Sequence, residues 1–572
     1  MKTKWGENLD RDNILIEYPR PQMQRDSYLN LNGAWQYAIT ETEKLPEQFD
    51  GDILVPFSPE CELSGVMRSL SPTQTLWYRR TLDLPLDFNV GRVLLHFGAV
   101  DQVATVYLNG TEVCSHTGGY TPFSADITTY LKEENTILVK VRDFSDTTYH
   151  SRGKQKNKRG GIWYTAQSGI WQTVWMESVP TDYISALRII PLFDESAVEL
   201  TAVSRSAQLC YAKVGEREVS FSSNKPVKLP MPQFIAWTPE CPHLYDLTVT
   251  MGEDHVKSYF GMRKFSVNTD DNGVKRLFLN NRPYFHNGLL DQGYYSDGMY
   301  TAPSDEAMIF DIQTAKNMGF NMLRKHIKIE PLRWYYHCDR IGMLVWQDMI
   351  NGGGEYRTMT ISSPLVTGIH FKDDHYKWFA RDNEAGRRQY CTELDEMIHH
   401  LYNVVAIAMW VPFNEGWGQF DAGKAVQQIL ELDTTRTIDH ASGWHDQKIG
   451  DIKSLHVYFK KYRFKPDKLG RAVVLSEFGG YNFRVKGHCF NEKDFGYKRF
   501  DTAEELLKAY RNLYEDEVQP AEKEGLCAAV YTQLTDVEDE LNGLISYDRK
   551  VIKLPVEKVR EINENVTALS QP

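Results

Sequence analysis

The 572-residue sequence predicts two successive β-sandwiches followed by a (β/α)8 barrel. Up to residue 267, apolar and polar positions alternate between turn residues, and no apolar repeat has the period of a helix. From residue 268 onward, short apolar runs alternate with amphipathic helical patterns. The chain is also too long for a single hydrophobic core, so several domains are expected.

Residues 1–180 are predicted to form a jelly-roll β-sandwich. Alternating segments that indicate strands lie at 75–84, 92–97, 104–108, 136–142 and 172–177. The Asn109-Gly110 pair after the third of these is typical of a tight hairpin turn. The absence of a helical period between the segments favours an all-β domain.

Residues 181–267 are predicted to form a second, smaller β-sandwich of the immunoglobulin-like type. Short strand patterns occur at 198–203 and 244–250. Turns between them are marked by prolines at positions 226, 230, 232, 239 and 242. A domain of fewer than about a hundred residues fits this fold.

Residues 268–572 are predicted to form the barrel. Its strands are expected in the apolar runs Pro283–Leu290, Asn321–Ile327, Met343–Met349, Ala406–Phe413, Thr437–Ala441, Ser454–Tyr458, Ala472–Phe478 and Cys527–Leu534. Helices are expected after Ser304 and at 331–341, 383–402, 419–432 and 502–523. Eight strands in about 300 residues match a (β/α)8 barrel.

The composition limits the partners. A net charge of −12 and a pI of about 5.8 disfavour nucleic acid and anionic membranes. The basic run from Arg152 to Arg159 is the exception, and we expect it to be a solvated hairpin or loop rather than a phosphate-binding patch. No segment has the roughly 18 apolar residues of a membrane span.

Cysteine and histidine positions give no sign of a metal or of disulfides. The eight cysteines are scattered without a CxxC pair, which favours a reduced, cytoplasmic protein. No apolar segment at the N-terminus signals secretion. The histidine spacings match no familiar zinc motif, so we expect neither a metal nor a cofactor.

Two glutamates follow predicted barrel strands. Glu415 comes just after the fourth strand, in Val411-Pro-Phe-Asn-Glu415, and Glu477 ends the seventh, in Val473-Val-Leu-Ser-Glu477. Active sites of such barrels lie at the carboxyl ends of the strands, so both side chains should enter one cup. Two converging carboxylates are the minimum for glycoside hydrolysis. The alternative is that one or both only support other groups or cap a helix.

Four motifs, in this order along the chain, resemble glycoside hydrolase family 2. They are Ile162–Trp175, Asn321-Met-Leu-Arg-Lys-His326, Asn414-Glu415 and Ser476-Glu477-Phe-Gly479. The resemblance covers essentially the whole chain. It implies a sugar-binding first domain and a catalytic barrel.

The resemblance also implies roles in a retaining double displacement. Glu477 is the expected nucleophile and Glu415 the acid/base, whose pKa should be raised while Glu477 is charged. Asn414 should hydrogen-bond the sugar 2-hydroxyl, and Arg324 should hold Glu477 as a carboxylate. Asp291, after the first strand, resembles an acid that binds sugar hydroxyls; a loop cap is its alternative.

Further candidates follow other strands. His326, His456 and Tyr458 could donate to sugar hydroxyls or to the rim of the oxocarbenium ion, although buried structural histidines are common. Trp444 and Tyr531 could form stacking walls of the sugar site. The large β-galactosidases of the family carry a metal-binding segment after strand 3. Here the chain has Trp346–Gly354 instead, which argues against a catalytic magnesium ion.

The identity of the sugar depends on the stretch after strand 8. Family β-glucuronidases hold the substrate carboxylate there with an Asn-x-Lys motif. This chain has Glu540 and Asn542 instead, whereas Asn491-Glu-Lys493 lies in a different loop. We therefore expect a neutral sugar, β-galactose first.

Several alternatives to a β-galactosidase stay open. A β-glucuronide, β-mannoside, arabinopyranoside or galactofuranoside could be the substrate. A more distant alternative is a non-catalytic carbohydrate-binding protein. A homo-oligomer would be unsurprising for the family.

Overall fold

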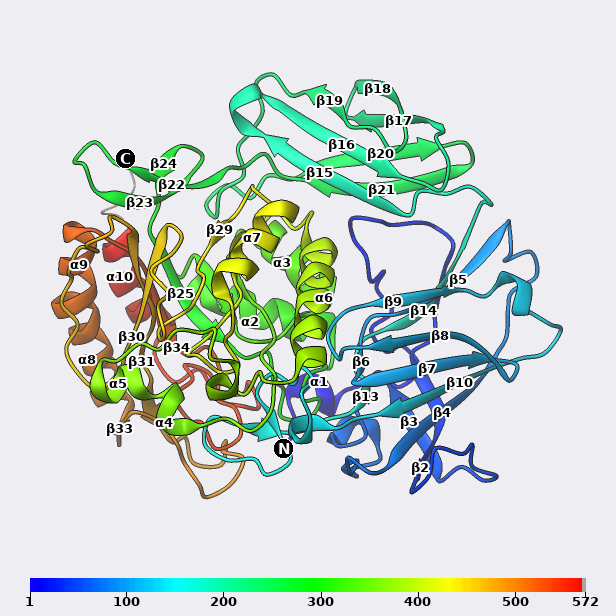
Figure 1. The fold of residues 1–572 in the computed structure, drawn as a ribbon, viewed down its shortest axis with the longest axis horizontal. Helices are drawn as coiled ribbons and strands as arrows, with labels where there is room; N and C mark the ends of the chain where they lie inside the picture. Colours follow the sequence, from blue (N-terminus) through cyan, green and yellow to red (C-terminus); the bar gives the residue numbers. More distant parts are fainter. Residues whose placement is uncertain (568–572) are drawn as a thin grey trace.

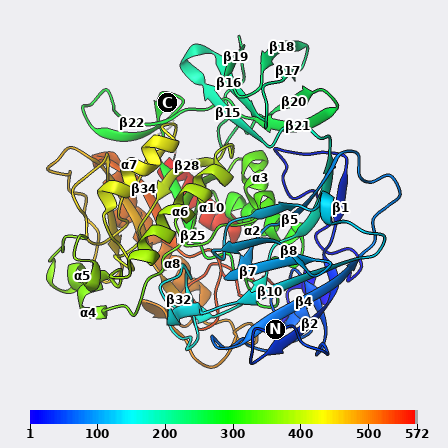
Figure 2. The ribbon, with the colours of Figure 1, turned by 45° about the vertical axis from the view of Figure 1, so that its right-hand side comes forward.

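The computed structural model describes residues 1–567. Three regions are visible in Figure 1: a first β-sandwich in blue and cyan, a second one in teal and green, and a larger α/β region. The first sandwich lies beside the barrel and the second lies next to both, an arrangement that persists in the turned view of Figure 2. The predicted fold class is therefore confirmed.

The first sandwich consists of two antiparallel sheets. One has the order β1 (Tyr28–Asn30), β14 (Val174–Val179), β5 (Arg92–Phe97), β9 (Phe123–Asp126). The other has the order β3 (Gly51–Val55), β2 (Gly33–Thr40), β4 (Thr75–Leu82), β10 (Asn135–Arg142), β7 (Val103–Leu108), β8 (Thr111–Thr117). Every second residue of β10 is buried, so one face of this sheet builds the core.

The second sandwich also has two sheets. They are β15 (Ala186–Leu192), β16 (Ala197–Val203), β19 (Val227–Pro230), and β18 (Arg217–Ser222), β17 (Leu209–Val214), β20 (Tyr245–Met251), β21 (Asp254–Phe260). A small sheet of β22 (Phe265–Thr269), β23 (Lys275–Leu279) and β24 (Arg282–Pro283) leads to the barrel. The domain boundary predicted after residue 267 falls inside β22.

The barrel sheet contains eight parallel strands, and each overlaps one of the predicted apolar runs. In sheet order they are β29 (Thr437–Ile438), β28 (Ile407–Val411), β27 (Leu344–Asp348), β26 (Met322–Lys325), β25 (His286–Asp291), β34 (Leu526–Thr532), β31 (Ala472–Gly479) and β30 (Ile452–Val457). Pairing of β25 with β34 joins the first strand to the last. Because all eight run in the same direction, their carboxyl ends form one rim.

Helices cover the outside of the barrel at the predicted places. They include α2 (Asp305–Asn317), α3 (Leu332–Ile341), α6 (Glu384–Leu401) and α7 (Ala422–Leu432). A further helix, α10 (Val556–Thr567), was not predicted. Ser304 caps α2 by accepting a hydrogen bond from the backbone N–H of Ala307.

The helix predicted at 502–523 is interrupted. It divides into α8 (Ala503–Leu513), a π-helical turn (Tyr514–Val518) and α9 (Gln519–Glu524). Pro520 explains the break, since proline lacks the N–H that a continuous helix needs at this position.

Two further sequence expectations concern the location of the protein. No helix among residues 1–567 combines the length and the apolar character that a membrane crossing needs. All eight cysteines are free thiols. The cytoplasmic location stays a prediction.

Candidate active site

Glu415 and Glu477 meet at the barrel rim. Glu477 lies within β31, and Glu415 follows the end of β28 by four residues. The backbone at Asn414 bridges Ser442, and the N–H of Glu415 donates to the Ser442 carbonyl at 2.9 Å. One oxygen of each glutamate and a ring nitrogen of His456 all lie within 4.8 Å of one another. The two acids therefore face one small space.

The backbone of Glu415 is strained. Its φ of 51° lies in the left-handed region, which a side chain with a Cβ rarely adopts. Such a conformation costs on the order of 1–3 kcal/mol and persists where surrounding contacts enforce it. Here the bridge to Ser442 and a hydrogen bond of 3.1 Å from the Trp417 indole to Glu415 Oε2 fix the side chain.

Two donors hold Glu477. Arg324 Nη1 donates to Oε1 at 3.2 Å, and the Tyr458 hydroxyl donates to Oε2 at 2.5 Å. Burial alone would lower the pKa of Arg324, but the charges of Asp348 and Glu477 raise it above its usual value, so the guanidinium stays charged. Burial and the Glu477 charge likewise raise the pKa of Tyr458, which keeps its hydroxyl a donor.

Arg324 forms hydrogen bonds with several residues of the site. Its Nε and Nη2 bind both oxygens of Asp348 at 3.0 Å, and Nη2 also donates to Asn414 Oδ1 at 2.8 Å. Since arginine has only donors, the Asn414 oxygen must face it, which leaves the amide N–H groups as donors toward the cup. His326 Nδ1 lies 2.6 Å from Asp348, and burial lowers the pKa of this imidazole, so it is neutral.

His456 lies between the two glutamates. Its Nδ1 is 2.7 Å from Glu415 Oε1 and 3.5 Å from Glu477 Oε2, while Nε2 contacts the Ser442 hydroxyl at 3.1 Å. Burial raises the pKa of Glu415, but the hydrogen bond and charge of His456, the charge of Lys154 and the Trp417 N–H together lower it below its usual value. The raised pKa expected from the sequence does not hold in this structure, because His456 occupies the space between the acids.

Three other candidates lie in different surroundings. Asp291 is buried, with one oxygen paired to Lys325 at 2.7 Å and the other accepting the Gly293 N–H at 2.9 Å. Trp444 is half-buried, 6.5 Å from the His456 ring, at the edge of the cup. Tyr531 is fully buried and packs on Tyr510 of α8 at 5.2 Å. The alternation of side chains along β34 turns Tyr531 toward the helices, so it is not brought to the site.

Sequence reasoning missed three residues of the site. Asp348 binds both Arg324 and His326, Trp417 binds Glu415, and Tyr497 stacks on Tyr458 at 3.7 Å with their planes 6° apart. Asp348 had a recognisable signal, because it is an acid at the end of an apolar strand. Tyr497 had none, since it comes from the long loop after β31.

The basic run at 152–159 is not the solvated loop that the sequence predicts. Arg152 is only 4% exposed. Its guanidinium donates to the carbonyls of Gly353 and Gly354, in the loop after β27. Arg159 pairs with Asp539 at 2.8 Å, in the segment after β34. Parts of this run are therefore buried by contacts with the loops after β27 and β34. Such contacts join distant segments, so no local pattern in the sequence indicates them.

The segment after β34 places an acid at the cup. Glu540 is buried, accepts a hydrogen bond from the Tyr164 hydroxyl and accepts one from the Asn542 amide at 3.1 Å. Lys493, in contrast, is exposed. The side chain of its motif partner Asn491 donates to Asp539 at 2.7 Å.

The atoms of Glu415, His456 and Glu477 that converge here could also bind a metal ion. Two carboxylate oxygens and an imidazole nitrogen are suitable ligands for a divalent cation. In this structure, however, the other oxygen of each glutamate accepts a hydrogen bond, from Trp417 and Arg324 respectively. Such bonds orient the acids toward the space between them.

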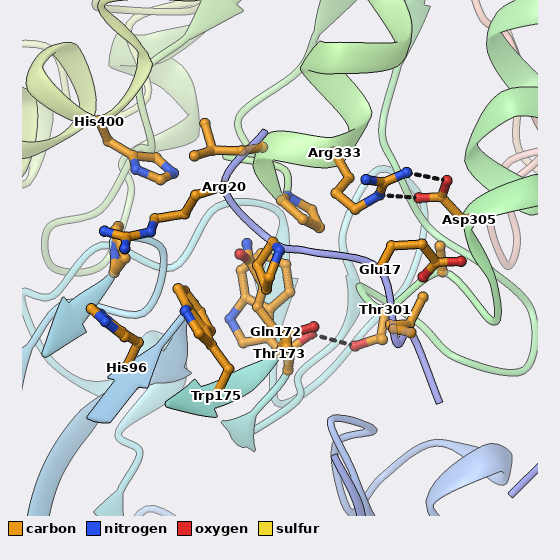
Figure 3. A pocket seen from close by; sticks show the side chains of 18 of the residues that line it. Glu17, Arg20, His96, Gln172, Thr173, Trp175, Thr301, Asp305, Arg333 and His400 are labelled. Atoms are coloured by element: carbon orange, nitrogen blue, oxygen red, sulfur yellow. Dashed lines mark hydrogen bonds and ion pairs between the residues drawn. The ribbon is translucent and has the colours of Figure 1, made fainter. Parts of the chain in front are cut away.

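A separate cavity lies between the first sandwich, the N-terminal segment and the barrel (Figure 3). Its volume is about 200 Å³, and its lining includes Trp175 of β14, Arg20 and His400 of α6. The ion pair of Arg333 with Asp305, at 2.7 Å, closes one side. None of the active-site residues described above lines it, so it is an interdomain joint distinct from the acid pair.

Comparison with known families assigns the class. Three family models match the chain: the family 2 sugar-binding domain over residues 64–180, the family 2 model over 193–263, and the family 2 TIM barrel domain over 273–477. Together they cover more than half of the chain, in the order of the three structural regions. The chain belongs to glycoside hydrolase family 2.

The relatives found by sequence comparison are named for two different activities. A β-galactosidase of Thermoanaerobacter pseudethanolicus is 25% identical over 82% of this chain and 62% of its own length. A β-glucuronidase of Streptococcus agalactiae is 23% identical over 70% of this chain and 68% of its own length. The chain thus spans less than two thirds of the first of these relatives.

Solved structures with the same fold include a β-D-glucuronidase of Dictyoglomus thermophilum and a β-galacturonidase of Eisenbergiella tayi. The first has a TM-score of 0.74 at 16% identity and covers 97% of this chain and 99% of its own. The second has a TM-score of 0.71 at 18% identity and covers 96% and 99%. At these identities the likeness concerns the fold.

Proposed function

We propose that the protein is an exo-acting, retaining β-glycosidase with Glu477 as nucleophile and Glu415 as acid/base. The approach of the two carboxylates carries this proposal. Retaining enzymes hold their carboxyl groups about 5–5.5 Å apart, whereas inverting enzymes keep about 6.5–9.5 Å for a water molecule. Oxygens within 4.8 Å favour retention.

In the first step an oxygen of Glu477 bonds to the anomeric carbon while the bond from that carbon to the aglycone oxygen breaks. Arg324 and Tyr458 orient Glu477 through their hydrogen bonds to its two oxygens. The proton of Glu415 passes to the departing oxygen, which leaves Glu415 as a carboxylate.

The second step reverses these roles. Glu415 takes a proton from water, the water oxygen bonds to the anomeric carbon, and the ester bond to Glu477 breaks. The amide N–H groups of Asn414 donate to the 2-hydroxyl, an interaction that strengthens in the transition state. Sugar binding must displace His456 from between the acids, and this frees Glu415 to carry the proton.

A neutral sugar, with β-galactose first, is the proposed substrate. Glu540 is a third buried acid near the two glutamates, and acids there would repel a uronate rather than bind it. The Asn491-Glu-Lys493 motif leaves its lysine exposed. β-Glucuronides stand as the alternative, since relatives with that name match the chain.

Kinetics with nitrophenyl glycosides test the sugar. We expect kcat/KM for the β-galactoside to exceed that for the β-glucuronide at least about tenfold, because like charges within about 4–6 Å disfavour each other. Lys493→Ala should leave both values unchanged. A preference for the glucuronide that disappears in Lys493→Ala would show that this loop holds the substrate carboxylate.

The pH profile tests the role of His456. His456→Gln removes the hydrogen bond and charge that lower the pKa of Glu415, while the burial that raises it remains. The pKa of Glu415 should therefore rise, and the alkaline limb of kcat/KM, which reports loss of its proton in the free enzyme, should move to higher pH. A limb that stays in place or moves to lower pH would contradict this role. His488→Gln is the control, because His488 is half-exposed and pairs with Asp548 rather than with either glutamate.

A further inference from the structure

A loop of the first sandwich closes one side of the barrel rim. The backbone of Ser151 bridges Gly352, in the loop after β27. Gly153 lies so close to the rim that a Cβ there would be 3.0 Å from the Ile327 carbonyl, two residues past β26. The positive φ of 63° at Gly153 also favours glycine. The chain therefore enters the rim beside the strands that carry Arg324 and Asp348.

The returning part of this loop contacts the opposite side. The Tyr164 hydroxyl donates to Glu540, and the Thr165 N–H donates to Glu538 at 3.1 Å, both after β34. The Trp163 ring packs edge-on against Trp417, after β28, with centroids 5.2 Å apart. One loop thus contacts the segments that follow four barrel strands, and it spans the cup between them.

Lys154 lies between these contacts. Its Nζ is 5.9 Å from the Trp163 ring centroid and 6.0 Å from that of Tyr164. Within residues 1–567 its ammonium makes no hydrogen bond or ion pair. Its charge favours the ionised form of both Glu415 and Glu540, although burial, the largest influence, leaves the pKa of Glu540 above its usual value. Trp163 packs against Trp417, which donates to Glu415, and Tyr164 donates directly to Glu540. Both rings beside Lys154 therefore contact the surroundings of these two acids.

Glu540 is held in place from behind. The Asn542 amide donates to Glu540 Oε1, Gln533 donates to Asn542 at 2.8 Å, and Gln292 donates to Gln533 at 2.8 Å. Burial leaves the pKa of Glu540 above its usual value, and the charge of Lys154 and the hydrogen bonds from Tyr164 and Asn542 offset part of this rise. A carboxylate fixed by such a chain of amides is a rigid acceptor.

We propose that Lys154 and Glu540 bind hydroxyl groups of the sugar held between the catalytic glutamates and thereby select an uncharged glycoside. This inference rests on the proposed function and names residues that determine its specificity. An ammonium offers only donors and a carboxylate only acceptors, and a sugar hydroxyl can satisfy either. The charge of Lys154 acts on both Glu415 and Glu540, so a sugar hydroxyl can accept from the ammonium without bringing a further negative charge toward these acids.

The test pairs enzyme variants with substrates that lack one hydroxyl. We expect Lys154→Met and Glu540→Gln each to lower kcat/KM for nitrophenyl β-galactoside about 10- to 100-fold, the range for hydrogen bonds to charged groups. Lys158→Met, an exposed lysine of the same loop, should change it less than about twofold. Circular dichroism melting of each variant reports folding, and Lys154→Gln replaces Lys154→Met if that protein does not fold.

The deoxy substrates distinguish a direct contact between Lys154 and the sugar from an indirect effect of Lys154 on the fold. We compare wild type and the Lys154 variant on 4-deoxy and 6-deoxy galactosides. For the analogue that lacks the hydroxyl bound by Lys154, the ratio of wild-type to variant kcat/KM should fall to about one. An equal penalty on all three substrates would overturn the inference, because Lys154 would then act only through the fold. A wild-type preference for the glucuronide that Lys154→Met abolishes would also overturn it. Either result leaves retaining catalysis intact, whereas activity retained by Glu477→Gln would remove the proposed function itself.

Discussion

Glu477→Gln should abolish turnover while the protein stays folded. The amide keeps the shape of the side chain but removes the nucleophile, so kcat should fall at least about a thousandfold. Arg324 is not left unpaired, because Asp348 still binds it through two hydrogen bonds. The amide oxygen of the substituted side chain can still accept from Arg324, so the melting temperature should stay near that of the wild type.

Glu355→Gln is the matched control for this change. Glu355 is exposed in the loop after β27, and its substitution should leave both activity and melting temperature unchanged. If Glu477→Gln melts like the wild type and keeps more than a tenth of the activity, Glu477 is not the nucleophile.

Glu415→Ala should slow hydrolysis according to the leaving group. Aryl glycosides with good leaving groups need little proton assistance, so they should be least affected in the first step. Alkyl and sugar leaving groups should lose at least about a hundredfold, the usual contribution of a positioned acid. Initial rates over a series of aglycones with increasing pKa measure this dependence.

Azide tests the second role of Glu415, as the base that activates water in the second step. A small anion can replace the water that Glu415 no longer activates, so the Glu415→Ala protein with azide should form a β-glycosyl azide. The Glu355→Gln protein should form none. Equal losses for every aglycone, together with no azide product, would show that Glu415 is not the acid/base.

Much of the fold could be predicted because its signals are local. The buried parallel strands of the barrel are short apolar runs, and each of the eight predicted runs overlaps an observed strand. The start of α2 could be predicted because Ser304 is a residue type that caps helix N-termini. The break before Pro520 shows the limit, because the amphipathic pattern continues through the π-helical turn and past the proline.

The site was predictable where it depends on strand ends. Parallel strands bring Arg324, Asn414, Glu415, His456 and Glu477 to one rim whatever their distance in sequence, and the structure places them together. Residues from loops were not predictable in this way. Lys154 and Tyr497 reach the cup through contacts between segments far apart in the chain, and Tyr531 faces outward because of its position in the alternation of β34.

The most direct test of the account is the anomer released first during hydrolysis. The proposed mechanism forms a glycosyl-enzyme on Glu477 and inverts the anomeric carbon twice, as the short separation of the carboxylates favours. Proton NMR of the wild-type reaction with an aryl β-galactoside should therefore show the β anomer before mutarotation produces the α form. Appearance of the α anomer first would contradict the double displacement.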